Sequence, residues 1–212
     1  MADLSALKET VIEGNSGQAR ALTHAALDAG IGPQEILDSA LIPAMDVVGE
    51  NFSAGEFFIP EMLIAARAMQ ACLEILNPLL AVAQSKSRGK AVLGTVKGDL
   101  HDIGKNLVKI MMQGAGFEVV DLGTDVKPER FVEAVKAEKP DFVMMSALVT
   151  TTMVNMGETI AALKQAGVRD GVRIGIGGAP VTQRYADEIG ADGYAPDASS
   201  AVDIAKAQLG VA

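Results

Sequence analysis

The sequence predicts an α/β protein in which an N-terminal four-helix bundle is followed by a doubly wound, five-stranded parallel sheet. Two patterns support this fold class. Residues 1–84 carry apolar side chains at spacings of three and four, which is typical of amphipathic helices. Over residues 91–212, short apolar runs alternate with helical patterns, as in successive βα units. The polar segment 85–90 separates the two patterns, and we predict that it is an interdomain linker.

In the N-terminal part, turn and capping residues divide the helical pattern into four segments. Gly14 ends the first segment, Asn15 or Ser16 caps the second, and Gly30 ends it. Pro33 opens the third, because proline is tolerated in the first turn of a helix. The apolar residues of the four segments are Leu4, Leu7, Val11 and Ile12; Ala19, Leu22, Ala26 and Leu27; Ile36, Leu37, Ala40, Leu41, Ala44, Val47 and Val48; and Ile59, Met62, Leu63, Ala66, Met69, Leu73 and Leu76. The short connections favour a small antiparallel bundle.

The C-terminal part is predicted to form a Rossmann-like (flavodoxin-like) open sheet. Its strand runs are Ala91–Val96, Phe117–Leu122, Phe142–Ala147, Val172–Ile176 and Gly193–Ala195, with helices near 103–115, 128–138, 152–166, 181–189 and 198–209. Runs that are apolar at nearly every position are typical of strands buried on both faces. Ligands of such domains bind beyond the carboxyl ends of the strands. His101, Ser146 and Gly177 follow strand ends, so we expect them at one edge of the sheet.

Composition excludes several classes of protein. The net charge is −9, the aromatic content is 4% and tryptophan is absent, which argues against nucleic-acid binding. No run of 18 or more apolar residues occurs, and the N-terminus lacks the pattern of a signal peptide, so we expect no membrane association. The single cysteine excludes an internal disulfide and fits the reducing cytoplasm. We therefore predict a cytoplasmic protein.

One segment, Gly98-Asp99-Leu100-His101-Asp102-Ile103-Gly104, combines a histidine with two aspartates at a strand-to-helix turn. A carboxylate that holds the Nδ1 proton of His101 leaves Nε2 free as a metal ligand. Zinc or iron would need further protein ligands, yet His24 and Cys72 both lie in the helical part. A macrocycle that supplies the equatorial ligands needs only one axial group. Alternatively, His101 and its aspartate neighbours only cap the following helix.

The same segment resembles a known family. Asp99-Leu100-His101-Asp102-Ile103-Gly104 matches the Asp-x-His-x-x-Gly signature of base-off/His-on cobalamin-binding domains. Ser146-Ala147-Leu148 before Thr150, and then Gly177-Gly178, match the family's later motifs in the expected order. The segment 51–62 resembles the cap module beside the cobalamin domain of methionine synthase. Nearly the whole chain thus resembles the small corrinoid proteins of methyltransferase systems.

The resemblance implies a role for each matching residue. His101 would be the lower axial ligand of cobalt, Asp99 its hydrogen-bonded partner, and Thr152 the end of the relay, where the family commonly has serine. The other implied cofactor contacts are Gly98, Leu100, Asp102, Ile103 and Gly104 at the turn; Ser146, Leu148 and Thr150 near the buried nucleotide base; Gly177, Gly178 and Ala198 along the tail; and Phe52, Ile59 and Met62 above the corrin. Two alternatives stay open, because Gly177-Gly178 also suits an ordinary tight turn and the cap residues also suit the core of the bundle.

By resemblance, the chain is a corrinoid methyl carrier that takes a methyl group onto Co(I) and carries it as methylcobalamin. A substrate-specific methyltransferase would load it, and an acceptor methyltransferase would pass the methyl group to tetrahydrofolate, a pterin or a thiol. A corrinoid reductive-activation protein is the third implied partner. The chain is too short to hold a further catalytic barrel of about 250 residues, so we expect no complete active site of its own. The alternatives are the cobalamin subunit of an adenosylcobalamin-dependent mutase, and a cobalamin escort or sensor protein.

Overall fold

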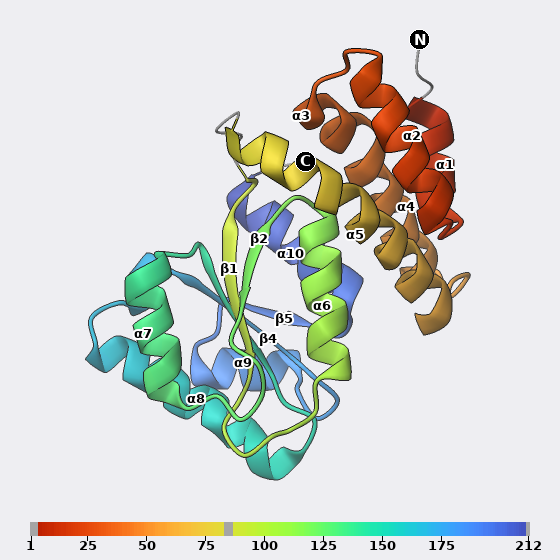
Figure 1. Ribbon diagram of the computed structural model, residues 1–212. Coiled ribbons are helices and arrows are strands. Elements are labelled where there is room, and N and C mark those ends of the chain that lie inside the picture. The colour runs from red at the N-terminus through yellow and green to blue at the C-terminus, as the bar shows by residue number, and fades with distance from the viewer. Residues whose placement is uncertain (1–3, 83–86, 211–212) are drawn as a thin grey trace. The chain divides into compact units, whose positions relative to one another are not determined.

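The chain folds into two compact units that meet in sequence between Ser87 and Arg88, and the short segment Gly114–Gly116 groups with the first unit. The computed structural model describes residues 4–82 and 87–210, with the side chains of residues 81 and 82 left out. Figure 1 shows a helical unit followed by an α/β unit, and the predicted fold class is confirmed. Residues 85 and 86 of the predicted linker lie outside the described residues, and Lys90, at its other end, is already the first residue of a strand.

The helical unit contains the elements expected from the sequence. They are α1 (Leu4–Ile12), α2 (Ser16–Asp28), α3 (Pro33–Ile36), a π-helical turn η1 (Leu37–Leu41), α4 (Ile42–Ser53) and α5 (Ile59–Val82). Asn15 caps α2, because its side-chain oxygen accepts a hydrogen bond of 3.1 Å from the backbone N–H of Gln18. The third predicted helix is interrupted, since the N–H of Ile42 bonds to the carbonyl of Leu37, five residues back. Pro43, which has no N–H to donate, follows directly.

Helix α5 is long and apolar, and it packs against α1, α2 and α4 within this unit. By length and composition alone, its segment Ile59–Leu80 could cross a membrane. A core helix of a soluble protein passes the same test, and 44% of the most apolar window is buried. Its packing against three other helices favours that interpretation.

The α/β unit is built on a parallel sheet with the strand order β2-β1-β3-β4-β5. The strands are β1 (Lys90–Thr95), β2 (Glu118–Asp121), β3 (Phe142–Ser146), β4 (Arg173–Gly177) and β5 (Gly193–Ala195). The connecting elements are α6 (Ile103–Gly114), α7 (Pro128–Glu138), α8 (Thr150–Gln165), η2 (Arg169–Gly171), α9 (Gln183–Ile189) and α10 (Ala198–Leu209). Residues of β1, β3 and β4 share one buried core with residues of α7, α8 and α9, whereas α6 and α10 lie on the opposite face (Figure 1).

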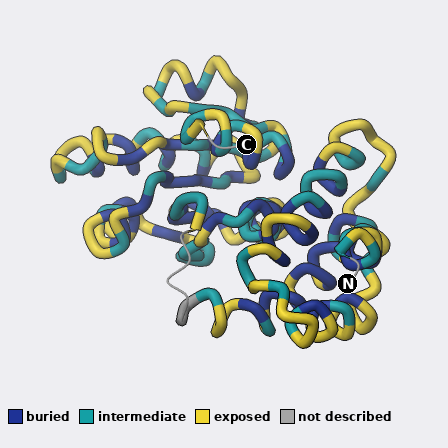
Figure 2. The backbone as a smooth tube through the Cα atoms, turned by 90° about the horizontal axis from the view of Figure 1, so that it is seen from above, coloured by how far each residue is buried: buried dark blue, intermediate teal, exposed yellow. Residues whose placement is uncertain are grey.

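The carboxyl ends of the strands are level with one another. Thr95 pairs with Ser146, Ser146 with Gly177, and Gly177 with Ala195. Strands β1 and β3 are buried over most of their length, whereas β2 and β5 at the two edges are mainly half-buried; Figure 2 colours the backbone by burial. The order reverses at β1, since β2 lies on one side of it and β3 on the other. The expectation that the loops after β1, β3 and β4 begin at one edge is therefore confirmed, and His101 lies in the loop beside this reversal point.

Candidate functional site

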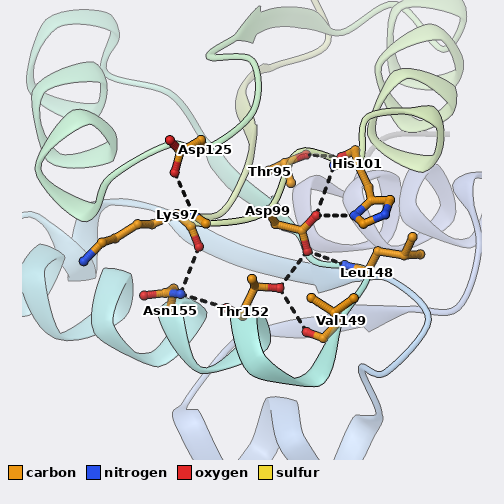
Figure 3. A network of polar contacts seen from close by, with 10 residues as sticks. Thr95, Lys97, Asp99, His101, Asp125, Leu148, Val149, Thr152 and Asn155 are labelled. Atoms are coloured by element: carbon orange, nitrogen blue, oxygen red, sulfur yellow. Dashed lines mark hydrogen bonds and ion pairs between the residues drawn. The ribbon is translucent and has the colours of Figure 1, made fainter.

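Asp99 is the centre of the polar network at this edge. Its side chain is fully buried, in the loop between β1 and α6. One oxygen, Oδ1, accepts hydrogen bonds from the backbone N–H of His101 at 3.1 Å and contacts the His101 ring Nδ1 at 2.7 Å. The other, Oδ2, accepts from the backbone N–H of Leu148 at 2.8 Å and from the Thr152 hydroxyl at 2.7 Å. Figure 3 shows these contacts converging on the carboxylate from α8, from the β3–α8 loop and from the β1–α6 loop that carries Asp99.

The His101 ring is held at one nitrogen only. Its side chain is 54% exposed, and in Figure 3 the ring points away from Asp99 with Nε2 at its far end. No hydrogen bond to Nε2 occurs among the residues that the structure describes. A carboxylate on Nδ1 fixes the tautomer that carries the proton there and leaves a lone pair on Nε2. The ring is therefore arranged as a ligand. It is Asp99, and not Asp102, that supports it.

The Asp99 carboxylate is ionised through its hydrogen bonds. Burial raises the pKa of Asp99, because a charge is less stable away from water. Hydrogen bonds from the Thr152 hydroxyl, the amides of Leu148 and His101, and the His101 ring lower the pKa further than burial raises it, so it lies well below its usual range. The imidazole thus faces a full negative charge that no lysine or arginine neutralises by a described ion pair.

Thr152 occupies the relay position expected from the resemblance. It is buried on the first turn of α8, and its hydroxyl has one proton to donate. The Asp99 oxygen lies at 2.7 Å and the carbonyl of Val149 at 3.0 Å, so the shorter contact is to Asp99. The geometry brings together the three residues predicted as ligand and relay. Their role in ligation stays a prediction.

Residues around His101 form an apolar platform, which we define as Leu100, Ile103, Leu148 and Val149. Leu100 is 74% and Ile103 72% exposed, and Leu148 and Val149 are also exposed. Large apolar side chains gathered on a surface are typical of ligand sites. A Cβ on Gly104 would meet no atom within 4 Å, so the start of α6 is open on that side. A flat, largely apolar ring system fits this surface.

Asp102 and the other motif residues take different positions. Asp102 precedes α6, where its carbonyl accepts from the N–H of Asn106 at 2.8 Å and its side chain from the Asn106 amide at 3.0 Å. The Asp102 side chain thus bonds to a side chain of α6, while His101 contributes no side-chain bond to that helix in the described network. Ser146 ends β3 half-buried, and Thr150 begins α8 exposed. No described hydrogen bond joins the side chains of Ser146 and Thr150 to Asp99.

Neighbouring backbone atoms leave no room for a Cβ at Gly177 or Gly178. A Cβ on Gly178 would collide with the carbonyl oxygen of Ala147, and its φ is +125°. A Cβ on Gly177 would lie 2.9 Å from the carbonyl oxygen of Ala195. These glycines let β3, β4 and β5 end close together, so on their own they do not point to a ligand. Ala198 is buried as the first residue of α10.

The three predicted cap residues differ in burial. Phe52 is half-buried near the end of α4, and Ile59 is 43% exposed at the start of α5. Phe58, beside Ile59, is 65% exposed and was not predicted. Met62 is fully buried, so its side chain is not open to a ligand in this structure. The roles of Phe52, Ile59 and Met62 above the corrin stay predictions, and the burial of Met62 also suits the helical core.

The side chains at this site suit a metal held in a macrocycle better than a bare metal ion. Over residues 4–82 and 87–210, no group of three or more His, Cys, Asp or Glu side chains is arranged to hold a metal ion. A bare zinc or iron ion would need such a group. His101 with its buried carboxylate, beside an apolar platform, instead fits a metal that arrives with its own equatorial ligands. The observed donor set therefore fits cobalamin.

Comparisons with known proteins agree with the geometry. Two family models, each described as a B12 binding domain, match residues 4–77 and 89–203. The chain belongs to the B12-binding corrinoid proteins. It is 46% identical over 206 residues to a trimethylamine corrinoid protein of Methanosarcina barkeri, covering 96% of this chain and 95% of the relative.

Two solved structures share this fold over nearly the whole corrinoid protein. One is a cobalamin-binding protein from Desulfitobacterium hafniense, with a TM-score of 0.81 and 34% identity, covering 98% of both chains. The other is the methanol:cobalamin methyltransferase complex from Methanosarcina barkeri, with a TM-score of 0.86 and 33% identity. That match covers 96% of this corrinoid protein and 78% of the other chain. Cobalamin is thus the cofactor of this family, as predicted.

The sequence analysis did not identify a second polar group at the same edge. Lys105 on α6 is buried, and its Nζ lies 2.7 Å from both carboxylate oxygens of Asp121, the last residue of β2. Asp125 and Asn155, which hold the backbone of the His101 loop, were also missed. The available signal was position, because Asp121 ends β2 and Asp125 lies in the connection after it, and β2 lies beside β1 in the sheet.

Proposed function

We propose that this chain is a corrinoid methyl carrier that holds cobalamin in the base-off, His-on state, with methylcobalamin as its loaded form. The observation that carries the proposal is the chain of contacts from Thr152 through Asp99 to His101. It leaves one imidazole nitrogen for cobalt at the edge of the sheet where ligands of such domains bind. When bound, the cobalt supplies the chemistry, because it accepts a methyl group from one partner and gives it up to another.

The residues of this chain orient the axial ligand. Nε2 of His101 would hold cobalt, while Asp99 keeps the proton on Nδ1 and makes the imidazole a stronger donor. Thr152 and the amide of Leu148 hold the carboxylate from the other side, at 2.7 and 2.8 Å. A proton on Asp99 or on Nε2 of His101 would weaken this donor, so proton uptake by the pair would favour release of the axial ligand.

Other residues of the α/β unit would surround the cofactor. The apolar platform would pack against the lower face of the corrin and exclude water there. Gly98 and Gly104 would allow a close approach at the turn, and Ser146 and Thr150 would hydrogen-bond the buried nucleotide. For Gly177, Gly178 and Ala198, we propose a place along the tail.

We assign a covering role to the helical unit. Phe52 and Ile59 would shield cobalt on its other face, and the predicted linker 85–90 would act as the hinge that lets partner enzymes reach it. The partners would be a substrate-specific methyltransferase, an acceptor methyltransferase and a reductive-activation protein, in the cytoplasm. The relative named after trimethylamine and the complex that acts on methanol point to a small methylated donor.

Three other functions fit the sequence less well. A mutase subunit would share the histidine motif without the helical unit, yet a B12 binding domain model matches residues 4–77 as well. The comparisons do not favour it. A light sensor would add a DNA-binding domain, and no nucleic-acid partner is expected at a net charge of −9. A storage or escort protein would bind cobalamin without being methylated, which the second experiment below distinguishes.

The first experiment tests the axial ligand. The protein is reconstituted with cobalamin, reduced to the cobalt(II) form and examined by EPR, as wild type, His101→Ala and the matched control His24→Ala. We expect nitrogen splitting from an axial imidazole in the wild type and in His24→Ala, and its loss in His101→Ala. A base-on spectrum of the wild type, or one unchanged by His101→Ala, would overturn the assignment.

The second experiment tests methyl carriage. Isotopically labelled trimethylamine, dimethylamine or methanol is supplied together with candidate methyltransferases and the reduced, cobalamin-loaded protein. We expect label on the protein-bound cobalamin with at least one pair, and at most a few per cent as much with His101→Ala. A protein that retains cobalamin but takes up no label with any pair would support storage or escort instead.

A further inference from the structure

A loop of six residues, Val96–His101, connects β1 to the axial histidine, and side chains outside the relay hold its backbone. Asp125, in the connection between β2 and α7, contacts the loop through both its side chain and its backbone. Its carboxylate oxygen Oδ1 accepts a hydrogen bond from the N–H of Gly98 at 2.6 Å, and its own N–H donates to the carbonyl of Asp99 at 2.9 Å. Asp125 therefore holds the residue before Asp99 and Asp99 itself.

The loop is also held from the opposite side. The Asn155 side chain, on α8, donates to the carbonyl of Lys97 at 3.0 Å. Figure 3 shows Asp125 above the loop at Lys97 and Asn155 below it. At the far end, the Thr95 hydroxyl donates to the carbonyl of His101 at 2.9 Å. Three side chains, from the β2–α7 connection, α8 and β1, thus hold the backbone of the loop.

Asp125 adopts a backbone conformation that most residues avoid. Its φ is +52°, in the left-handed region that favours glycine. Among the described non-glycine residues, only Lys139, at the end of α7, shares this feature, with a φ of +47°. A non-glycine residue persists in this region when surrounding contacts over-determine it, and such residues cluster at functional sites. Lys139 ends a helix, where this conformation is common, whereas Asp125 lies beside the His101 loop.

We propose that Asp125 is a positioning residue for the axial ligand, which it aligns by fixing the Gly98–Asp99 backbone. The inference rests on the proposed role of His101. With half of its surface exposed, the His101 ring is oriented by its bond to Asp99 and by its own backbone. A rotation at Gly98 or Asp99 would therefore displace the carboxylate from Leu148 and Thr152 and tilt the ring. Small displacements of a ligating group weaken coordination strongly.

The position of Asp125 makes the idea testable without unfolding the protein. The side chain is exposed, so a variant lacking it leaves the N–H of Gly98 free to bond to water and creates no cavity. A hydrogen bond from an amide to an ionised carboxylate is among the stronger kinds, although exposure to solvent weakens it. Loss of this hydrogen bond should therefore raise the rate of hydrogen exchange at the Gly98 amide about tenfold.

The experiment compares Asp125→Ala and Asp125→Asn with the control Lys139→Ala. Lys139 is the other non-glycine residue with a positive φ, and it lies 38 positions after His101 in the sequence. In the protein without cofactor, hydrogen exchange of the Gly98 amide is followed by NMR. We expect exchange about tenfold faster in Asp125→Ala than in the wild type. Asp125→Asn retains an oxygen acceptor and should stay within about twofold, as should Lys139→Ala.

The second arm uses the cobalamin-loaded cobalt(II) protein. We expect a smaller fraction of His-on signal in the EPR spectrum of Asp125→Ala and an unchanged fraction in the other two variants. Equal His-on fractions in Asp125→Ala and the wild type, or equal losses in Lys139→Ala, would overturn the proposal. A wild type without nitrogen splitting would instead overturn the function proposed above, and the exchange of Gly98 would still show whether Asp125 holds the loop.

Discussion

Two aspartates at the same edge of the sheet, Asp99 and Asp121, are held in opposite ways. Asp121 ends β2, and Asp99 follows the neighbouring strand β1. Asp121 contacts the ammonium groups of Lys105 at 2.7 Å and Lys109 at 3.2 Å, and accepts from the N–H of Gly123 at 2.9 Å. The partners of Asp99 are two backbone amides, a hydroxyl and an imidazole. Both carboxyls are ionised, but only Asp121 is neutralised by cations.

The difference separates a residue that joins two elements of the fold from one that holds the imidazole of His101. The negative charge of Asp121 is matched by the ammonium group of Lys105. That group is buried, and a buried charge without a partner would destabilise the fold. That pair joins α6 to the end of β2. The charge of Asp99 is stabilised by neutral donors, which do not cancel it, so it remains available to the imidazole of His101. The pKa of both carboxyls is thus lowered, by cations together with an amide at Asp121 and without lysine or arginine at Asp99.

The largest expected effect is on stability, in the variant Asp121→Ala. It would leave the buried ammonium of Lys105 without its bidentate partner, and breaking such a pair costs about 3–5 kcal/mol. We expect the free energy of unfolding, measured with urea, to fall by about this amount. Asp203→Ala, which removes an exposed carboxylate on α10, is the control and should change it by less than about 0.5 kcal/mol.

The same variant tests the comparison itself. If Asp121 only builds the fold, the folded fraction of Asp121→Ala should bind cobalamin with an unchanged His-on EPR signal. A loss of that signal in protein shown to be folded by circular dichroism would mean that the Lys105–Asp121 pair also controls the ligand. The distinction between the two aspartates would then fail.

The fold was predictable because its signals are local. Strands buried on both faces give apolar runs such as Phe142–Ala147, and the loops after them follow from strand parallelism. The observed strand β3, Phe142–Ser146, differs by one residue. The π-helical turn Leu37–Leu41 was missed because the apolar spacing continues through it. In retrospect, Pro43 inside a helical pattern was the only signal, and it does not specify which turn of the helix changes.

The site was predictable only in part. The motif around His101 predicted its contact with Asp99, and a hydroxyl was expected at Thr152; the structure brings the three residues together. The contacts of Asp125 with Gly98 and Asp99 join residues 26 to 27 positions apart in sequence, and nothing local indicates a left-handed aspartate. Burial of Met62 likewise depends on which apolar residues of α5 face the other helices of the unit. Such pairings arise from tertiary packing, which a single sequence does not display.

An intermediate effect is expected at Thr152. Thr152→Val keeps the shape but removes the hydroxyl that donates to Asp99, so a buried carboxylate oxygen loses one of two partners. Such a loss costs about 1–3 kcal/mol. In contrast to Asp121→Ala, it should also reduce the His-on signal, because the carboxylate loses one of its anchors. Thr152→Ser, which keeps the donor, is the control and should retain the signal. A normal signal in Thr152→Val would show that Thr152 is no part of the relay.

The smallest expected effect is a pH dependence of the stability that Asp121 provides. Protonation of the Asp121 carboxyl removes only part of the difference in free energy of unfolding between wild type and Asp121→Ala. Burial raises the pKa of Asp121, but bonds from Lys105, Gly123 and Lys109 lower it further, so it lies below its ordinary value. A carboxyl with a lowered pKa stabilises the fold above the unfolded-state value of about 3.9 and loses this contribution as pH falls through its folded-state value.

The stability gap between wild type and Asp121→Ala should therefore be complete at neutral pH and narrow below about pH 4, where the unfolded chain takes up the proton first. Urea unfolding of both proteins between about pH 3 and 7 measures the gap directly, and other carboxyls cancel because they titrate in both. Asp203→Ala should show no gap at any pH. A gap that stays constant to the lowest pH would mean that Asp121 stabilises by packing rather than by charge, and the contrast with Asp99 would then lose its electrostatic basis.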